Sequence, residues 1–295
     1  MACRTLEKAK DAMKRILADN ENKNLDLIPM ECDLSSLESI SAFASNFNSE
    51  NPIDVLCLNA GLARDVGSKE VLRTKDGFEL TIGTNHLGHF YLSSLLLDSK
   101  KINPDVGRVV VTASGVHDPD SPGGAQGSLA TLGDLSGLEG GPNFEMVDGK
   151  AFDPDKAYKD SKLCNVFFTR ELERRLDEKG SKIRAYCFNP GLIVGTGLFR
   201  EQNKVFTKIF DFAATDLLKV GETTHFGGGC LEYMAISNEL PRNGGYFTSA
   251  PGSSKFGDDA FGLQFHDTEV SKEARGREKG MKLWSVSEKL VGIKV

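Results

Sequence analysis

The sequence lacks several features that would define a protein class immediately. None of its apolar runs approaches the roughly 20 residues that a membrane-spanning helix requires. Positive charge is not in excess, because 36 Lys and Arg oppose 42 Asp and Glu, and this excludes the basic surface typical of nucleic-acid binding. The six cysteines form no CxxC pair and no metal-ligand spacing, so we expect reduced thiols in an intracellular protein. The N-terminus shows neither a signal peptide nor a transit segment.

What is present is a regular alternation of short apolar runs and amphipathic stretches. The apolar runs predict strands near 25–33, 53–58, 108–112, 183–188 and 245–249. The stretches between them predict helices near 6–16, 36–43, 76–97 and 161–179, and a polar C-terminal helix near 268–290 that covers a sheet edge. This alternation predicts a single α/β domain over 1–295, a doubly wound Rossmann-type parallel sheet with ligands at the carboxyl ends of its strands.

Two irregular stretches interrupt the alternation. Residues 117–153 are rich in Gly, Pro, Asp and Ser and are too long for an ordinary connection, and residues 192–215 form the second stretch. Each follows the carboxyl end of a predicted strand, so we expect them to form a lid over a binding site. The alternative is a surface excursion without a binding role.

The sharpest chemical signal is the pair Tyr158 and Lys162. Residues at i and i+4 lie on one face of a helix, and a nearby ammonium favours the phenolate. We therefore expect Lys162 to lower the pKa of Tyr158 and to suit its hydroxyl to proton transfer. Such a pair alone is weak evidence, since any lysine-rich helix can contain one.

Four further motifs accompany this pair in a fixed order. These are Asn59-Ala60-Gly61, Asn85, Ser114, and Pro190-Gly191 followed by Thr196. Together with Tyr158 and Lys162 they resemble the short-chain dehydrogenase/reductase superfamily over essentially the whole chain. The resemblance implies that Tyr158 donates a proton and that Lys162 holds the nicotinamide ribose. It also implies that Ser114 orients the substrate and that Asn85 anchors a proton-relay water.

The same resemblance implies a cofactor site. Arg4 stands where the second strand of the family ends, and a guanidinium there suits the 2′-phosphate of NADPH. The cofactor-binding residues it implies are Arg4, Asp33, Leu34, Asn59, Ala60, Gly61, Tyr158, Lys162, Pro190, Gly191 and Thr196.

Longer motifs resemble one branch of the superfamily, the light-dependent NADPH:protochlorophyllide oxidoreductases. They are the segments 131–138, 156–165, 196–200, 249–257 and 282–292. The resemblance implies reduction of a tetrapyrrole, with hydride from NADPH and a proton added at the neighbouring carbon. It also implies a plastid location, or a cytoplasmic one if the source is a cyanobacterium.

One departure from the branch concerns the substrate side. Leu192 follows Pro190-Gly191 where the branch usually has Cys, and leucine neither donates nor accepts a proton. Leu192 and Phe199 are the candidate substrate contacts, and Phe206 and Phe210 could face a flat ligand, a membrane surface or the core. Two alternatives therefore stay open: a dark-active carbonyl or retinol-type reductase, and a catalytically silent pigment-binding paralogue. Peripheral membrane contact and self-association are also open.

A second departure concerns the phosphate site. No strand-linked Gly-rich turn occurs in the chain, and Gly227-Gly228-Gly229 falls in a predicted helix. The family places such a turn after its first, central strand, where a helix N-terminus binds the pyrophosphate. We therefore expect Met1 to be an internal residue of the second strand, in a chain that lacks the first strand and its turn.

Overall fold

A computed structural model describes residues 1–19, 25–194, 196–199, 220–241, 244–256 and 265–293. Its central feature is a five-stranded sheet in the order β3-β4-β5-β6-β7. The strands are β3 (Val55–Leu58), β4 (Arg108–Thr112), β5 (Arg184–Phe188), β6 (Gly245–Thr248) and β7 (His266–Asp267). The first four run parallel and β7 is antiparallel. The predicted α/β class and parallel sheet are confirmed, whereas β7 had no recognisable signal in the sequence.

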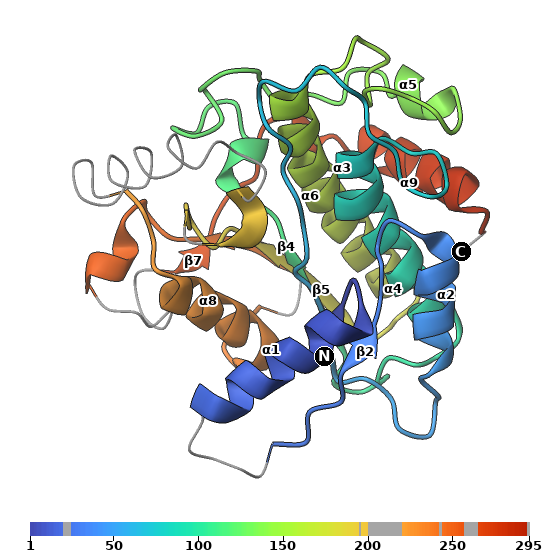
Figure 1. Cartoon of the computed structure of the whole chain (residues 1–295), viewed down its shortest axis with the longest axis vertical. Coiled ribbons are helices and arrows are strands. Elements are labelled where there is room, and N and C mark those ends of the chain that lie inside the picture. The colour runs from blue at the N-terminus through green and yellow to red at the C-terminus, as the bar shows by residue number, and fades with distance from the viewer. Residues whose placement is uncertain (20–24, 195, 200–219, 242–243, 257–264, 294–295) are drawn as a thin grey trace.

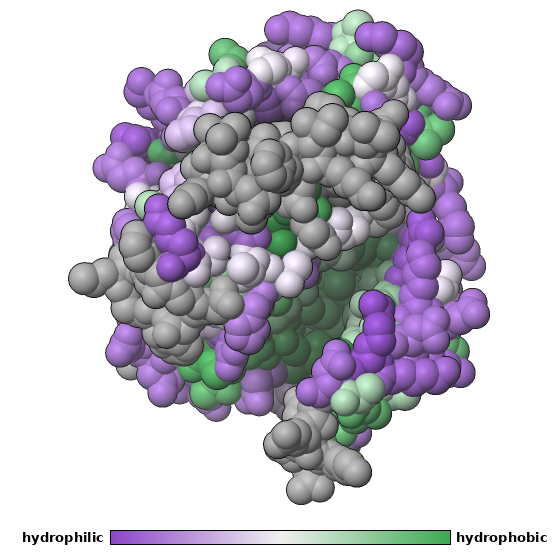
Figure 2. Space-filling view, turned by 60° about the vertical axis from the view of Figure 1, so that its left-hand side comes forward, coloured by the Kyte–Doolittle hydropathy of each residue, from purple (hydrophilic) through white to green (hydrophobic). Residues whose placement is uncertain are grey.

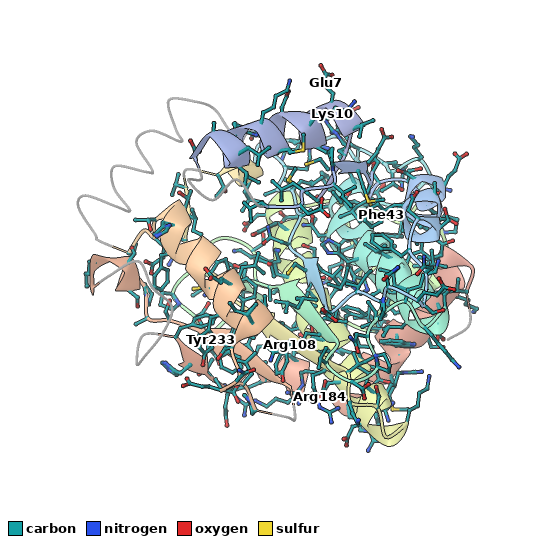
Figure 3. All side chains as sticks on the ribbon, turned by 90° about the horizontal axis from the view of Figure 1, so that it is seen from below. Glu7, Lys10, Phe43, Arg108, Arg184 and Tyr233 are labelled. Atoms are coloured by element: carbon teal, nitrogen blue, oxygen red, sulfur yellow. The ribbon has the colours of Figure 1, made fainter. Side chains whose placement is uncertain are left out.

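The register brings the carboxyl ends of the parallel strands to one edge. Arg108 pairs with Arg184 at the starts of β4 and β5, and both lie at the same end of the molecule in Figure 3. Thr112 pairs with Phe188 at the opposite ends, where the predicted site residues follow.

Side chains of the central strands alternate between two cores, as the period of two in a strand requires. Val109 and Val111 belong to the larger core with residues of α6 (Pro154–Glu178). Val110 belongs to the smaller core with residues of α8 (Thr224–Ile236). Helices therefore cover both faces of the sheet, the doubly wound arrangement (Figure 1).

The helix predictions hold with three corrections. The helices α1 (Leu6–Asp19) and α2 (Leu37–Ser45) lie where the sequence predicts them, and α6 ends as predicted but begins earlier, at Pro154 rather than near 161. The helix predicted for 76–97 is instead three segments: α3 (Leu80–Ile82), a π-helical turn (Gly83–Leu87) and α4 (Gly88–Asp98). The C-terminal helix α9 (Arg277–Val291) follows a short 3₁₀ turn (Glu273–Arg275) and packs on α6 and α4 rather than on a sheet edge.

The amino-terminal strands form a separate sheet. β1 (Ala2–Cys3) pairs in parallel with β2 (Met30–Glu31), and neither pairs with β3 in the described chain. Cys57 is exposed although it lies inside β3. Figure 2, which turns the side of α1 and α8 toward the viewer, shows a hollow with a hydrophobic floor.

The first irregular stretch is a packed part of the structure between 130 and 148. It contains the short helix α5 (Ser136–Glu139), and several of its side chains are fully buried: Leu132, Leu135, Leu138, Met146 and Val147. Most of the second stretch, including Phe206 and Phe210, lies outside the described residues. No helix in the described ranges has the length and apolar character needed to cross a bilayer.

Candidate active site

Helix α6 places Tyr158 and Lys162 on one face, above the carboxyl end of β4. The helix begins at the N-cap Asp153, whose side chain accepts hydrogen bonds from the amides of Asp155 and Lys156, and Pro154 occupies the first turn. The Nζ of Lys162 lies 5.7 Å from the centre of the Tyr158 ring and donates to the carbonyl of Thr112 over 2.9 Å. The Lys162 side chain is therefore anchored directly to β4 of the sheet.

Ser114 completes the proton-transfer group. It follows β4, caps the short turn Gly115–His117, and forms a side-chain hydrogen bond with Tyr158. Tyr158 and Ser114 are both half-buried, so their hydroxyls lie at the boundary between the interior and the open edge of the sheet.

Asn85 lies inside the π-helical turn and is fully buried. Its Oδ1 accepts from the Leu62 amide, while Nδ2 donates to the Leu62 carbonyl and to Ser161 Oγ. Its own carbonyl contacts His89 Nδ1 over 3.2 Å. All of these partners come from the protein, so Asn85 here fixes the loop after β3 against α6.

Gly61 brings the loop after β3 into the same group. A Cβ at this position would lie 3.4 Å from Asn85 Oδ1 and 3.7 Å from Lys162 Nζ. Asn59 accepts from the Thr112 hydroxyl over 2.8 Å, and Asn59 and Ala60 are exposed. The turn is therefore open to a ligand on one side and in contact with the proton-transfer group on the other.

Burial sets the acid–base properties of the pair in a direction that the sequence did not predict. It raises the pKa of Tyr158 to about 12, while the hydrogen bond with Ser114 opposes the shift. It lowers the pKa of Lys162 to about 8, because the charged ammonium loses solvent. The expectation that Lys162 lowers the pKa of Tyr158 is wrong for this arrangement: desolvation dominates, and Tyr158 stays protonated at neutral pH.

The remaining predicted residues follow the ends of other strands. Arg4 is exposed after β1, and Asp33 and Leu34 are half-buried after β2. The Asp33 carboxylate accepts from the amide and the hydroxyl of Ser35, over 3.0 and 2.7 Å. These three residues follow the strands of the separate two-stranded sheet.

Pro190 and Gly191 follow β5, and Gly191 has a positive φ of 86° that favours glycine. Leu192 is half-buried and Thr196 is exposed, with its hydroxyl donating to the Ile193 carbonyl. Among the described residues, no hydrogen bond joins Thr196 to Tyr158. The side chain of Phe199, a predicted substrate contact, lies outside what the structure describes.

Two positioning residues were missed by sequence reasoning. Ser161 lies between Tyr158 and Lys162 and links α6 to Asn85, so its place inside the motif was a usable signal. Glu222 is buried, approaches Gly191, and accepts from the amides of Ser253 and Ser254. Nothing in the sequence pairs Glu222 with that distant segment.

The residues fit a nicotinamide cofactor at two places. The Lys162 ammonium has one acceptor among the described residues, which leaves two N–H groups for sugar hydroxyls. The half-buried and exposed residues after β2 and β3 can contact an adenosine. The pyrophosphate has no Gly-rich turn to bind within residues 1–295.

Comparison with known proteins decides the family. A protochlorophyllide reductase of Daucus carota is 38% identical over 299 residues, covering 99% of this chain and 71% of that protein, and it is described as chloroplastic. The chain belongs to the protochlorophyllide reductase family. The chloroplastic reductase of Chlamydomonas reinhardtii is 35% identical with the same coverage. The family model described as short chain dehydrogenase matches residues 1–126. This is an oxidoreductase family that uses NAD(P).

Solved structures agree on the fold. An uncharacterized protein from Mycobacterium paratuberculosis superposes with a TM-score of 0.63 at 28% identity, covering 100% of this chain and 84% of that chain. An alcohol dehydrogenase from the archaeon Thermococcus sibiricus, complexed with 5-hydroxy-NADP, gives a TM-score of 0.52 at 15% identity, with 83% of each chain covered. At that identity the likeness concerns the fold alone.

Proposed function

We propose that this protein reduces protochlorophyllide to chlorophyllide with NADPH in a light-dependent reaction. The observation that carries the proposal is the group of Tyr158, Ser114, Lys162 and Asn85 at the carboxyl edge of the sheet, in a chain of this family. A tetrapyrrole is then the substrate, and the chloroplastic relatives favour a plastid location. Peripheral membrane contact and self-association stay predictions.

The reaction adds one hydride and one proton across a carbon–carbon double bond. NADPH, when bound, supplies the hydride. Tyr158 donates the proton, since its hydroxyl is protonated at neutral pH. The phenolate left behind lies beside the Lys162 ammonium and Ser114, which stabilise it until it takes a proton from solvent.

Leu192 departs from the branch and takes no part in proton transfer, so the proposal assigns the proton to Tyr158. A leucine side chain has no exchangeable proton, so a donor at the position after Gly191 is excluded. In this protein Leu192 supplies apolar contact to the pigment.

Arg4 supports NADPH over NADH. It is exposed at the carboxyl end of β1, the edge at which the adenosine end of a dinucleotide binds in such folds. Its guanidinium matches the geometry of a phosphate.

The test compares two reactions of the native protein. With NADPH and protochlorophyllide, we expect chlorophyllide absorbance to appear under illumination and not in darkness. NADPH consumption by aldehydes or retinal in darkness, without photoproduct, would instead support a carbonyl reductase. Pigment binding without any conversion would support a silent paralogue.

A further inference from the structure

Along the chain, the segment 126–148 lies between Ser114 and Tyr158, the two hydroxyl-bearing residues of the proton-transfer group. On one side the chain leaves Ser114 through the turn Gly115–His117, where His117 Nδ1 contacts the Ser114 carbonyl over 2.8 Å. On the other side it enters α6 at the N-cap Asp153, one helical turn before Tyr158. The position of this segment therefore bears on both hydroxyls.

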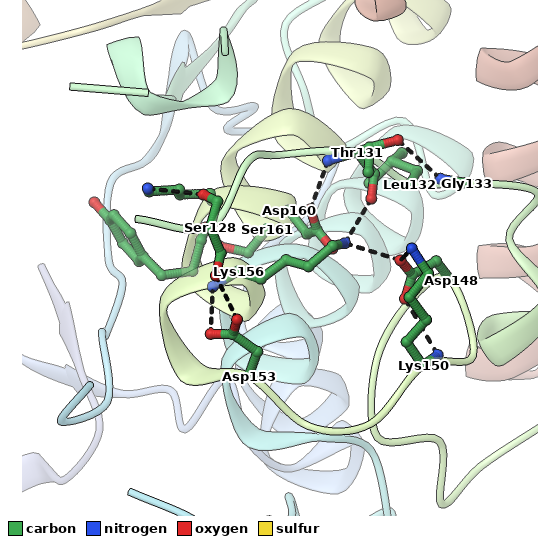
Figure 4. A network of polar contacts seen from close by, with 12 residues as sticks. Ser128, Thr131, Leu132, Gly133, Asp148, Lys150, Asp153, Lys156, Asp160 and Ser161 are labelled. Atoms are coloured by element: carbon green, nitrogen blue, oxygen red, sulfur yellow. Dashed lines mark hydrogen bonds and ion pairs between the residues drawn. The ribbon is translucent and has the colours of Figure 1, made fainter. Parts of the chain in front are cut away.

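Two ammonium groups of α6 bind the segment. Lys159 Nζ donates to the carbonyls of Gln126 and Ser128 at its start, and Lys156 binds it farther along the chain (Figure 4). Lys156 Nζ donates to the Thr131 carbonyl over 2.7 Å and lies 2.5 Å from Asp160 Oδ2 and 3.2 Å from Asp148 Oδ2. Asp160 Oδ1 accepts from the Thr131 amide over 3.0 Å. Lys156 thus binds the Thr131 carbonyl and Asp160 binds the Thr131 amide, and these two side chains are one turn apart on α6.

The Lys156 ammonium holds both arms of the segment together. Asp148 belongs to the returning arm, and a Cβ on Gly133 of the outgoing arm would lie only 2.8 Å from the Asp148 Cβ. Ser136 Oγ donates to the Asp148 carbonyl over 3.0 Å. We call Lys156, Asp160 and Asp148 the charge clasp.

The clasp is buried and places two carboxyl groups against one ammonium. The side chains of Asp160 and Asp148 are 0% and 3% exposed, and that of Lys156 is 12% exposed. Lys150 also approaches Asp148, at 3.6 Å, but its side chain is 73% exposed. Because Lys156 donates to the Thr131 carbonyl and to Asp160 and also pairs with the Asp148 carboxylate, a neutral side chain of similar length cannot replace it.

We propose that Lys156 is a positioning residue, whose contacts with Thr131, Asp160 and Asp148 fix residues 131–148 of the segment on α6 and thereby set Tyr158 relative to Ser114. The expected loss of light-driven turnover rests on the proposed function. The expected change in hydrogen exchange of the segment does not, so the two predictions can fail separately.

The first experiment replaces Lys156 with Met and measures two quantities. Hydrogen exchange in peptides covering 128–135 should become at least about tenfold faster, while peptides of β4 and β5 stay within about twofold of wild type. Light-driven turnover at saturating pigment should fall about tenfold or more with the KM for NADPH nearly unchanged, because misplacing a reacting group lowers kcat rather than cofactor binding.

Lys150→Met is the matched control. It removes a lysine that approaches the same Asp148 carboxylate from solvent, so both quantities should stay within about twofold of wild type.

A second variant separates positioning from simple loss of stability. Lys156→Met leaves the Asp160 carboxyl without its cation and Asp148 with only the exposed Lys150, which can unfold the protein. Lys156→Met/Asp160→Asn removes one charge of each sign and leaves Asp148 beside Lys150, so the midpoint of urea unfolding should recover. The Thr131 carbonyl still lacks its donor, and we expect exchange in 128–135 to stay fast and turnover to stay low.

Two results would overturn the proposal. One is wild-type exchange in 128–135 for Lys156→Met, which would show that the clasp does not hold the segment. The other is recovery of turnover together with stability in the double variant, which would make Lys156 a structural residue only. If the native protein gives no photoproduct at all, the exchange measurement still decides whether the clasp holds the segment.

Discussion

At the scale of single residues, desolvation rather than charge pairing governs the proposed proton donor. The sequence predicts a lysine that acidifies a tyrosine, yet burial raises the pKa of Tyr158 to about 12 and lowers that of Lys162 to about 8. The spacing of four residues was sufficient to place both groups on one face. It could not predict how much solvent the fold removes from them, because that depends on Ser114, Thr112 and Gly61 from other parts of the chain.

Arg4→Ala tests the cofactor preference. We expect the Kd for NADPH to rise by about tenfold to a hundredfold, since a charged contact to phosphate is lost, while the Kd for NADH changes by less than about threefold. Fluorescence titration of the native protein with each cofactor measures both constants. An equal loss for the two cofactors would contradict the assignment.

Asp160 makes the stability of the protein dependent on pH in an uncommon direction. Burial raises its pKa to about 7, against the attraction of Lys156. The native state therefore keeps a proton that the unfolded chain releases near pH 4, so this carboxyl makes the protein less stable as pH rises from about 4 to about 7.

Asp160→Asn removes this contribution. The stability of the variant relative to wild type should increase between about pH 4 and about pH 7 and then level off, as measured by urea unfolding across that range. A relative stability that is constant above about pH 5 would show that Asp160 ionises normally.

At the scale of elements, the existence and order of strands and helices were predictable, whereas close contacts between them were not. Apolar runs marked β3, β4, β5 and β6 because each strand lies between helices in the interior of the fold. The break of the helix predicted over 76–97 had no such signal, and β7 is only two residues long. Both features depend on tertiary packing.

Gly88 and Gly228 give a matched test of one such contact. A Cβ on Gly88, in α4, would lie 2.5 Å from the Leu34 carbonyl, whereas one on exposed Gly228, in α8, meets nothing within 4 Å. Gly88→Ala should lower the free energy of unfolding by about 1–3 kcal/mol, because the backbone after β2 must move. Gly228→Ala should raise it by about 0.4–1 kcal/mol, since alanine favours the helix. Urea unfolding measures both, and equal effects would contradict the close approach of α4 to Leu34.

At the scale of the whole molecule, the C-terminal helix joins the layer that carries the proposed site. Trp284 of α9 lies 4.9 Å from Phe90 and 5.9 Å from Phe168 between ring centres, and the Arg175 guanidinium lies 4.4 Å from its ring. His86, one residue after Asn85, contacts Ser287 of the same helix over 3.0 Å. The tail that the sequence suggested as a solvated helix therefore supports α4 and α6.

This packing predicts one cooperative unit. Because Trp284 is the only tryptophan, its fluorescence reports on α9 alone, and far-UV circular dichroism reports on all helices. The two signals should give the same urea midpoint for the native protein. A fluorescence transition at clearly lower urea would show that α9 unfolds independently of the α/β domain.

The central claim is that Tyr158 donates the proton of a light-driven reduction at the carboxyl edge of this sheet. The most direct measurement is the yield of chlorophyllide after illumination of the native protein and of Tyr158→Phe, each with NADPH and protochlorophyllide. We expect the wild type to form product only in light, and the variant to bind NADPH normally but to form product about a hundredfold more slowly or worse. A wild-type rate in Tyr158→Phe would contradict the account.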